Sequence, residues 1–570
     1  MRVSFRWCLP VAVGMVTLWR VVVILLVAAA NLEVEVWGFR PKTVQPLYRS
    51  TGKWKARHAH RVEKDQTWIW PLPAEWSKGE STLLVDSQLE LVVRGALNQS
   101  HVLEESFERY IAHIFVHLTE KDVVSKIKRR KWGGETLQKL VVNVVSDDET
   151  LQLGTDESYT LQVPAEGKTS EAYLEAATVY GALRGLETFS QLCRFNFSIK
   201  AVQIAETPWN VKDSPRFQFR GLLIDTSRHY LPVETIKKII DSMAFAKLNV
   251  LHWHIVDTQS FPLEIPSYPD LWKGAYSKAE RYTMDDARNI VEYARRRGIN
   301  IMPELDSPGH AASWGVGYPK LWPSRDCQQP LDISSKLTFE VIAGILADFR
   351  NVFPFKLMHL GGDEVDTSCW NNTPHVNDWL EKRNLSAHDG YASFVLEVQK
   401  LAIALDWAPV NWEEPFNEFG NLLHPDTVVH EWLSNDLVPK IIATGRQCIV
   451  SNQDVWYLDH LDVPWELFYL NEPLTDLNSA EQQRLVIGGE VCMWGETADP
   501  SDIEATIWPR AAAAAERLWS PVHSANSTAT ARARLSRFRC LLNERGVGAG
   551  PVRNYYAREG PYEPGSCYDQ

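Results

Sequence analysis

Positive charge is in short supply along this chain. Its 570 residues include 59 Lys and Arg against 72 Asp and Glu, which leaves a formal net charge of −13 at pH 7. Nucleic acids and anionic membrane surfaces repel a protein of that charge, so we expect neither as a partner. The hydrophobic fraction of 45% and the charged fraction of 23% lie near globular averages, which argues against a disordered, collagenous or multi-span membrane protein.

Two catalytic motifs are also absent. The sequence contains no G-x-S-x-G and no H-E-x-x-H, and no cysteine is flanked by a plausible base. These absences argue against a serine or cysteine nucleophile and against a zincin-type metal site. His252 and His254 do form an H-x-H pair of a kind that recurs in metal-dependent barrel hydrolases. The seventh and eighth strands predicted below carry no histidine, so we predict no metal and no cofactor.

The first 30 residues have the features of a targeting segment. Arg2 and Arg6 lead into an apolar stretch at residues 21–30, whose last three residues are small alanines suited to cleavage. Crossing a bilayer takes about 20 apolar residues, and Arg20 limits this stretch to half that length. We predict a cleaved signal peptide over residues 1–30, with an uncleaved anchor as the alternative.

Cysteine is scarce and unevenly placed. One of the eight, Cys8, lies in the predicted signal peptide, and none occurs between residues 9 and 192. Cys448 and Cys492 fall in apolar runs and are expected to be buried thiols. Four others lie in polar surroundings that suit disulfides: Cys327, Cys369, Cys540 and Cys567. Five N-x-S/T sequons agree with a secretory route: Asn98, Asn196, Asn371, Asn384 and Asn526.

The pattern of apolar residues divides the mature chain into two domains. Residues 31–205 mix apolar runs with helix-like stretches, which predicts a small α+β domain. In residues 206–570, eight short apolar runs each end in a polar cluster: FRGLLIDTSRH, NVLHWHIVD, INIMPELDSPGH, KLMHLGGDEV, APVNWEE, TVVHEW, CIVSNQDVWYLD and LVIGGEVCMWGE. Helical spacing occurs between several of them, and one helix is expected to begin at Thr283, with Asp286 as its capping partner. This alternation predicts a (β/α)8 barrel with a C-terminal extension, an α/β fold whose active site gathers at the C-terminal strand ends.

Two adjacent carboxylates end the fourth of these runs. In HLGGDEV, a glycine pair is followed by Asp363 and Glu364. An isolated Asp-Glu pair is most often a solvated loop, but this pair would face the barrel mouth. An ordinary retaining glycosidase holds two carboxyls about 5 Å apart on opposite sides of the scissile bond, whereas neighbouring strand residues point to opposite faces. One carboxyl could instead protonate a leaving oxygen while the other steadies a nucleophile that belongs to the substrate.

Aromatic residues mark the ends of the fifth to eighth predicted strands. The chain has 23 Trp, and a Trp ring suits a sugar face as well as a protein core. Five aromatic residues occur at successive strand ends: Trp412, Trp432, Trp456, Tyr457 and Trp494. Glu413, Asp459 and Glu496 follow beside them. The sequence therefore predicts an aromatic wall with polar tips suited to sugar hydroxyls.

Further polar residues lie on the other predicted strands. Arg220, on the first, could donate two hydrogen bonds to vicinal hydroxyls, and a structural ion pair with a barrel carboxylate is its alternative role. Asp257, Glu304 and His310 end the second and third strands. We expect these three to orient Asp363 and Glu364 through hydrogen bonds without contacting the substrate themselves.

The motifs together resemble a known family. FRGLLIDTSRHYLP, HWHIVD, PELDSPGH, HLGGDEVD, WYLD, GGEVCMWGE and WPRAAAAAERLW occur in the order found in the family 20 glycoside hydrolases, the β-N-acetylhexosaminidases of lysosomes and vacuoles. The resemblance runs from about residue 80 to the C-terminus. It implies a retaining exo-glycosidase that removes terminal β-linked N-acetylglucosamine or N-acetylgalactosamine by substrate-assisted catalysis.

The resemblance also implies roles for individual residues. Glu364 would be the general acid, and Asp363 would hold the substrate acetamido group while that group attacks the anomeric carbon. Seven residues would bind the sugar: Arg220, Trp412, Trp432, Tyr457, Asp459, Trp494 and Glu496. Two family disulfides would correspond to Cys327–Cys369 and Cys540–Cys567. The third disulfide of animal relatives has no counterpart, and Thr258 stands where relatives often have a second Asp.

Other expectations stay open at this stage. The substrate implied is an N-glycan end, a chitin oligomer or a glycolipid, and the destination is a lysosome, a vacuole or the extracellular space. The family is commonly dimeric, so a homodimer is one expectation. A carbohydrate-binding protein on an inactive barrel and a metal-dependent deacetylase are the competing functions, but the first would have lost Glu364, which is present.

Overall fold

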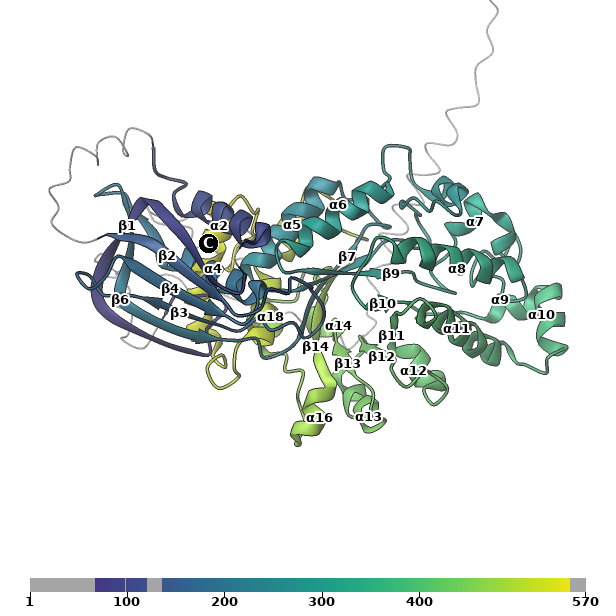
Figure 1. Cartoon of the computed structure of the whole chain (residues 1–570). Coiled ribbons are helices and arrows are strands. Elements are labelled where there is room, and N and C mark those ends of the chain that lie inside the picture. The colour runs from purple at the N-terminus through teal and green to yellow at the C-terminus, as the bar shows by residue number, and fades with distance from the viewer. Residues whose placement is uncertain (1–66, 98, 120–135, 554–570) are drawn as a thin grey trace, which may run out of the picture. The chain divides into compact units, whose positions relative to one another are not determined.

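The computed structural model describes residues 67–97, 99–119 and 136–553 (Figure 1). The predicted signal peptide, the sequon at Asn98 and Cys567 lie outside these residues. All of these described residues belong to one compact unit.

A six-stranded sheet forms the N-terminal part of the described chain. Its strands run in the order β1-β2-β4-β3-β6-β5, and β1 also pairs with β6. Their bounds are β1 Glu75–Gly95, β2 Leu137–Val144, β3 Tyr159–Val163, β4 Glu171–Ala176, β5 Cys193–Asn196 and β6 Ala201–Asp213. Helices α2 (His101–Ile114) and α4 (Val179–Leu192) accompany the sheet, and every residue of α4 is buried.

Eight parallel strands close into a barrel after the sheet. They are β7 Phe219–Asp225, β8 Val250–His254, β9 Asn300–Glu304, β10 Leu357–His359, β11 Ala408–Trp412, β12 Val428–Glu431, β13 Cys448–Val450 and β14 Val486–Met493. Each of the eight apolar runs supplies one strand, so the predicted (β/α)8 barrel is confirmed. The strands are short and buried because helices cover the barrel from outside, as parallel sheets require.

The helices of the barrel differ in length around it (Figure 1). The longer ones are α5 Val233–Phe245, α6 Met284–Arg295, α8 Lys336–Arg350, α11 Ala387–Ile403, α18 Arg510–Trp519 and α19 Thr528–Glu544. The shorter ones are α7 Trp314–Gly317, α9 Ser368–Asn372, α10 Pro374–Glu381, α12 Glu413–Phe419, α13 Val438–Ala443, α14 Gln453–Trp456, α15 Trp465–Leu470, α16 Ala480–Leu485 and α17 Ile503–Ile507. Helix α6 begins at the predicted capping box, in which the Thr283 hydroxyl accepts from the Asp286 N–H and the Asp286 carboxylate accepts from the Thr283 N–H.

The barrel interior changes character along its axis. At the N-terminal strand ends it is filled by an apolar cluster that includes Val250, Met302, Val410 and Ile449. At the C-terminal ends the cluster is smaller and partly aromatic, with Trp412 and Tyr457. Between these two clusters lie buried histidines and carboxylates. Apolar side chains therefore fill the barrel at the N-terminal strand ends. The polar side chains lie toward the C-terminal strand ends, where the active sites of such barrels form.

The cysteines and sequons take the following positions. Cys327 and Cys369 form a disulfide with 5.7 Å between their Cα atoms, and Cys540 is also disulfide-bonded. Cys193, Cys448 and Cys492 are buried free thiols. The sequon side chains Asn371, Asn384 and Asn526 are exposed, whereas Asn196 is half-buried. Within the described ranges, no helix combines the length and the apolar character needed to span a bilayer.

Candidate active site

A pocket of about 160 Å³ lies at the C-terminal ends of the barrel strands. It is lined by Arg228, His254, Asp257, Asp306, His310, Asp363, Glu364, Trp412, Trp432, Gln453, Tyr457, Asp459, His460, Trp494 and Glu496. A larger cavity of about 950 Å³ lies between α2 and α6, lined mainly by carboxylates and arginines. We assign the active site to the smaller pocket, because it gathers carboxylates, histidines and aromatic rings at the functional end of the barrel.

The loop after β10 delivers the two adjacent carboxylates in different directions. Gly361 and Gly362 both have positive φ, 60° and 99°, and Glu364 does too, at 49°. A Cβ atom at Gly361 would lie 1.9 Å from the Asp306 carboxylate, so only glycine fits there. The tight turn leaves the Asp363 side chain 13% exposed and the Glu364 side chain 60% exposed. One carboxyl therefore lies deep in the pocket and the other at its mouth.

Asp363 lies beside a second buried carboxyl, Asp306. Burial raises the pKa of Asp363, and burial together with the Asp363 charge raises the pKa of Asp306 well above its usual range. Asp306 accepts a hydrogen bond from the Gly362 N–H at 2.9 Å. The Oδ1 atom of Asp363 is buried and has no hydrogen-bond partner in the described part of the chain. Because buried polar atoms are normally paired, this oxygen is positioned to accept a hydrogen bond from a ligand.

His310 connects both carboxylates of the loop to a buried line of polar groups. Its Nε2 atom lies 3.4 Å from Glu364 Oε2 and 3.6 Å from Asp363 Oδ2, and its Nδ1 atom lies 3.2 Å from Asp257 Oδ1. Burial opposes the charged imidazolium, but the Asp363 charge and the Asp257 hydrogen bond raise the pKa of His310 well above its usual value. The hydrogen bond with His310 in turn lowers the pKa of Glu364.

Asp257 and Glu304 continue this line beneath the pocket. His254 Nε2 lies 2.9 Å from Asp257 Oδ2, and His254 Nδ1 lies 2.5 Å from Glu304 Oε2. Glu304 is fully buried, and its Oε1 accepts from the Trp412 Nε1–H at 2.8 Å. Burial alone would raise the pKa of Glu304, but His254 and two further imidazoles lower it well below its usual range. Glu304 therefore keeps its charge and fixes both His254 and the Trp412 ring.

Four aromatic residues form the wall of the pocket. Trp412 and Tyr457 are almost fully buried, while Trp432 and Trp494 are partly exposed. The Trp432 and Tyr457 rings stack with centroids 6.2 Å apart, and those of Trp412 and Trp494 lie 5.9 Å apart. Trp456 points away into the core, where its Nε1–H donates to the Phe468 carbonyl. Four of the five predicted aromatic residues thus line the site.

Charged groups occupy the rim. Arg228 contacts Asp257 Oδ2 at 2.7 Å and Glu496 Oε1 at 3.6 Å, and its guanidinium lies over the Trp494 ring. Asp459 Oδ1 is buried without a hydrogen-bond partner among the described residues. The Glu413 carboxylate instead caps the backbone N–H groups of residues 432 and 433, outside the pocket. The rim thus offers one guanidinium and two carboxylates to a polar ligand.

Comparisons with known proteins agree with this geometry. A model of glycosyl hydrolase family 20, catalytic domain, matches residues 217–522, and one described as beta-acetyl hexosaminidase like matches residues 69–192. Beta-hexosaminidase 1 of Arabidopsis thaliana is 58% identical over 510 residues, 88% of this chain and 94% of that protein. The chain belongs to glycosyl hydrolase family 20.

Two other similar proteins have lower sequence identity to this chain. The Homo sapiens beta-hexosaminidase subunit beta is 38% identical over 79% of this chain and 82% of that protein. The structure of a Flavobacterium johnsoniae chitobiase superposes with a TM-score of 0.75 at 28% identity, over 87% of this chain and 75% of that one. As a family 20 glycosyl hydrolase, the protein is an enzyme that acts on carbohydrate.

The expectation for Arg220 is wrong for this family 20 enzyme. Arg220 is fully buried near the start of β7, at the barrel end opposite the pocket. Its NH2 atom lies 2.7 Å from both oxygens of Glu157, its NH1–H donates to the Phe217 carbonyl and its Nε–H to the Lys247 carbonyl. A residue at the N-terminal end of a barrel strand cannot reach the C-terminal face. The structure shows the alternative role, a structural ion pair, but the partner Glu157 lies just before β3 of the N-terminal sheet and is not a barrel carboxylate.

Several pocket residues of this family 20 barrel were missed from the sequence. Arg228 and Asp306 line the pocket, and both lie inside the polar clusters DTSRH and PELDSPGH that end the first and third strands. Gln453 and His460 enter from the segment after β13. Arg228 and Asp306 could have been predicted from their position alone, because a polar residue just after a barrel strand lies near the mouth of the barrel.

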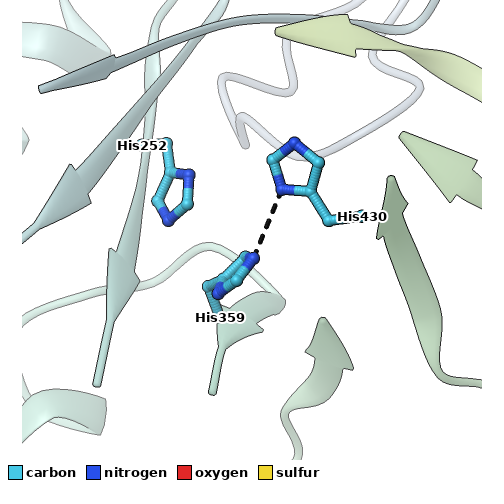
Figure 2. A group of neighbouring side chains, drawn as sticks. All are labelled: His252, His359 and His430. Carbon is cyan, nitrogen blue, oxygen red and sulfur yellow. Dashed lines mark hydrogen bonds between the residues drawn. The ribbon is translucent and has the colours of Figure 1, made fainter. Parts of the chain in front are cut away.

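Two groups of side chains in the described residues have the composition of metal ligands: His252, His359 and His430 (Figure 2), and Asp306, His310 and Asp363. In the histidine group, His252 Nδ1 lies 2.8 Å from Glu490 Oε1, and the other two rings are hydrogen-bonded to each other. In the second group, His310 already bridges Asp257 and the two carboxylates of the loop. His252 Nε2 has no hydrogen-bond partner among the described residues, although Glu304 Oε2 lies 3.1 Å from it. The other nitrogens of the two groups have protein partners.

Proposed function

We propose that this family 20 enzyme is an exo-acting β-N-acetylhexosaminidase that cleaves terminal β-linked N-acetylglucosamine or N-acetylgalactosamine with retention of configuration, using the acetamido group of the substrate as nucleophile. The observation that carries the proposal is the carboxylate pair. Asp363 and Glu364 are adjacent on one turn, one deep and one at the mouth. An acid and a protein nucleophile would instead flank the anomeric carbon from opposite sides.

Glu364 is the general acid of this proposal. At the pocket mouth it would protonate the leaving oxygen and afterwards activate water against the cyclic intermediate. The His310 hydrogen bond lowers the pKa of Glu364, so an acidic medium favours the protonated form that starts the reaction. This fits an enzyme that works in an acidic compartment.

Asp363 is the partner carboxylate. Its unpaired Oδ1 would accept the acetamido N–H and orient the acetamido oxygen toward the anomeric carbon. Burial and the Asp363 charge raise the pKa of Asp306, and in this proposal Asp363 carries the negative charge of the pair. That charge would stabilise the oxazolinium-like intermediate as positive charge develops.

The remaining pocket residues would bind the sugar. We assign Trp412, Trp432 and Trp494 to enclose the acetamido methyl and the ring, and Tyr457 to hydrogen-bond the acetamido oxygen. The outer hydroxyls would meet Asp459 and Glu496, with Arg228 in the place first expected for Arg220. These charged groups at the rim would restrict cleavage to chain ends. Asp257, Glu304 and His310 would hold the carboxylates and the Trp412 ring in place through hydrogen bonds and ion pairs.

The decisive experiment varies the substrate at C2. With an acetamido nucleophile, a substrate bearing a plain 2-hydroxyl should be nearly inert, and a thiazoline mimic of the cyclic intermediate should bind far more tightly than the product sugar. Asp363→Asn should also lower kcat, because an amide lacks the stabilising charge. Rapid hydrolysis of the 2-hydroxyl substrate, or a glycosyl ester trapped on a protein carboxylate, would show that a protein group is the nucleophile.

The cellular setting is part of the proposal. A disulfide between Cys327 and Cys369 and exposed sequons at Asn371, Asn384 and Asn526 support passage through a secretory route. We propose a lysosome-like or vacuolar destination, or secretion. Hydrolysis rates on defined N-glycan, chitin-oligomer and glycolipid substrates would identify the natural one, and the hydrodynamic mass would test the homodimer.

A further inference from the structure

The middle of the barrel interior is polar where such barrels are usually filled by branched apolar residues. The alternate strands β8, β10, β12 and β14 contribute one residue each to this middle layer: His252, His359, His430 and Glu490. All four are fully buried. None of them lines the pocket, so the substrate-binding surface does not account for them.

Two of these histidines, His359 and His430, are hydrogen-bonded to each other (Figure 2), and further hydrogen bonds connect them to the loop after β10. The Gly361 N–H donates to His359 Nδ1 at 3.2 Å, and His359 Nε2 lies 3.3 Å from His430 Nδ1. His430 Nε2 lies 2.6 Å from Ser451 Oγ, which donates to the Glu490 carbonyl at 3.1 Å. This chain of hydrogen bonds thus begins at the backbone of the turn that carries Asp363 and Glu364.

Only one direction of donation satisfies every bond of the chain. A neutral imidazole has one donor and one acceptor, and burial lowers the pKa of both His359 and His430. With His359 protonated at Nε2 and His430 at Nε2, each donor has an acceptor from Gly361 to the Glu490 carbonyl. The opposite direction would pair His359 Nδ1–H with Glu304 Oε1 at 2.9 Å and leave the Gly361 N–H without this partner. The contacts of Glu304 with Trp412 and His254 do not decide between the directions, because a carboxylate can accept several hydrogen bonds. The first direction is the one in which both the Gly361 N–H and the Ser451 hydroxyl donate within the chain.

We propose that His359 and His430 are positioning residues, which hold the catalytic turn through the Gly361 N–H and so fix where Asp363 and Glu364 lie. Gly361 is also held from the other side, because its carbonyl accepts from Asn411 Nδ2 at 2.9 Å. The two hydrogen bonds hold the two successive peptide units on either side of the Gly361 Cα atom. Displacement of a reacting group by about 1 Å can cost a hundredfold in rate. The inference rests on the proposed roles of Asp363 and Glu364.

The test compares His359→Leu with His359→Asn. Leucine removes the acceptor for the Gly361 N–H, whereas the asparagine Oδ1 can take the place of Nδ1. We expect the leucine variant to lose at least tenfold in kcat on a chromogenic N-acetylglucosaminide, with KM changed less than threefold. The asparagine variant should keep kcat within about threefold of wild type.

A control variant separates positioning from general destabilisation. Met302→Ala opens a cavity in the apolar cluster of the same barrel, so it should lower Tm while leaving kcat within twofold. If His359→Leu does not fold, His430→Leu and Ser451→Ala test the same chain one and two bonds further on. Both should lower kcat without a matching rise in KM.

Several outcomes would overturn the inference. The first is a folded His359→Leu variant with wild-type kcat. The second is a His359→Asn variant whose kcat is no higher than that of His359→Leu, and the third is a change in KM without a change in kcat. Each would mean that His359 and His430 have a purely structural role. Failure of the proposed function is distinguishable, because the wild-type enzyme itself would then not turn over the N-acetylglucosaminide.

Discussion

Glu364 is the residue on which turnover should depend most directly. Glu364→Gln removes the proton donor but keeps the shape of a side chain that is 60% exposed. We expect kcat to fall by orders of magnitude, with little change in Tm, since the glutamine Oε1 can still accept a hydrogen bond from His310. Steady-state kinetics and thermal unfolding of the purified variant measure both. A variant that keeps more than about a tenth of wild-type turnover would contradict the assignment.

The leaving group provides an internal control for Glu364→Gln. A substrate with an activated leaving group needs less protonation, so its loss in kcat should be smaller than that of a natural glycoside. Equal losses on both substrates would point to a distorted pocket instead of a missing proton.

Arg220 and Arg228 should respond oppositely to the same substitution. Arg220→Met breaks a fully buried pair with Glu157, so the free energy of unfolding should fall by about 3–5 kcal/mol while kcat/KM of the folded protein stays unchanged. Arg228→Met removes a guanidinium from the pocket rim, so kcat/KM should fall by about ten- to a hundredfold, as expected for a hydrogen bond to a charged group worth ~1.5–3 kcal/mol. Denaturant unfolding and kinetics on both variants distinguish the two roles.

The contrast between Arg220 and Arg228 also shows which residue positions could not be predicted from the sequence. Asp363, Glu364 and three tryptophans of the pocket could be placed because they follow directly on predicted strands. Arg220 lies inside such a strand, and its side chain bonds to Glu157 from a distant segment. That partner is a tertiary contact, which no local pattern contains.

At the scale of elements, the strands were more predictable than their connections. Each barrel strand is a short apolar run with a polar end, and buried parallel strands require that pattern. The segment between β13 and β14 contains three short helices, α14, α15 and α16, in place of one long helix. Gln453 and His460 come from this segment, so its irregular path explains why both pocket residues were missed.

Disulfide mapping tests how the loops and the C-terminal segment are held. Cys327 and Cys369 join the segment after β9 to α9, and we predict that Cys540 of α19 pairs with Cys567. Mass mapping under non-reducing conditions should show these two links and three unmodified thiols, at Cys193, Cys448 and Cys492. Those thiols are buried, so alkylation should require denaturant. A link involving any of the three would refute this pairing and weaken the argument for a secretory route.

At the scale of the whole molecule, the acidic balance extends into the interior. The net charge of −13 is accompanied by buried carboxyls on the barrel strands. Some, such as Glu304, face imidazoles that lower the pKa. Glu431 on β12 is different, because it is fully buried and neither of its carboxyl oxygens has a hydrogen-bond partner among the described residues. An unpaired buried carboxyl is stable only when it is protonated.

Glu431 should therefore make the stability of the enzyme depend on pH. Burial, followed by the charge of Glu413, raises the pKa of Glu431 to about 8 from an ordinary 4.5, although the nearby backbone N–H groups of Ser451 and Ser434 act in the opposite direction. The folded state thus binds this proton more tightly than the unfolded state. The stabilisation is fully present below about pH 4.5 and is lost as the pH rises toward 8, with a slope of up to ~1.4 kcal/mol per pH unit.

Glu431→Gln isolates this contribution, because glutamine resembles the protonated acid and cannot ionise. Other carboxyls, including Glu414 and Asp306, titrate in both proteins, so only the difference between the two stability curves reports on Glu431. We expect the variant to lose less stability than the wild type between pH 4.5 and 8 in denaturant unfolding, and the two curves to converge at the acidic end. Parallel curves across that range would mean that Glu431 is already ionised or solvated in the folded protein. Curves that diverge as the pH rises would show that the protonated Glu431 makes the folded protein more stable at acidic pH.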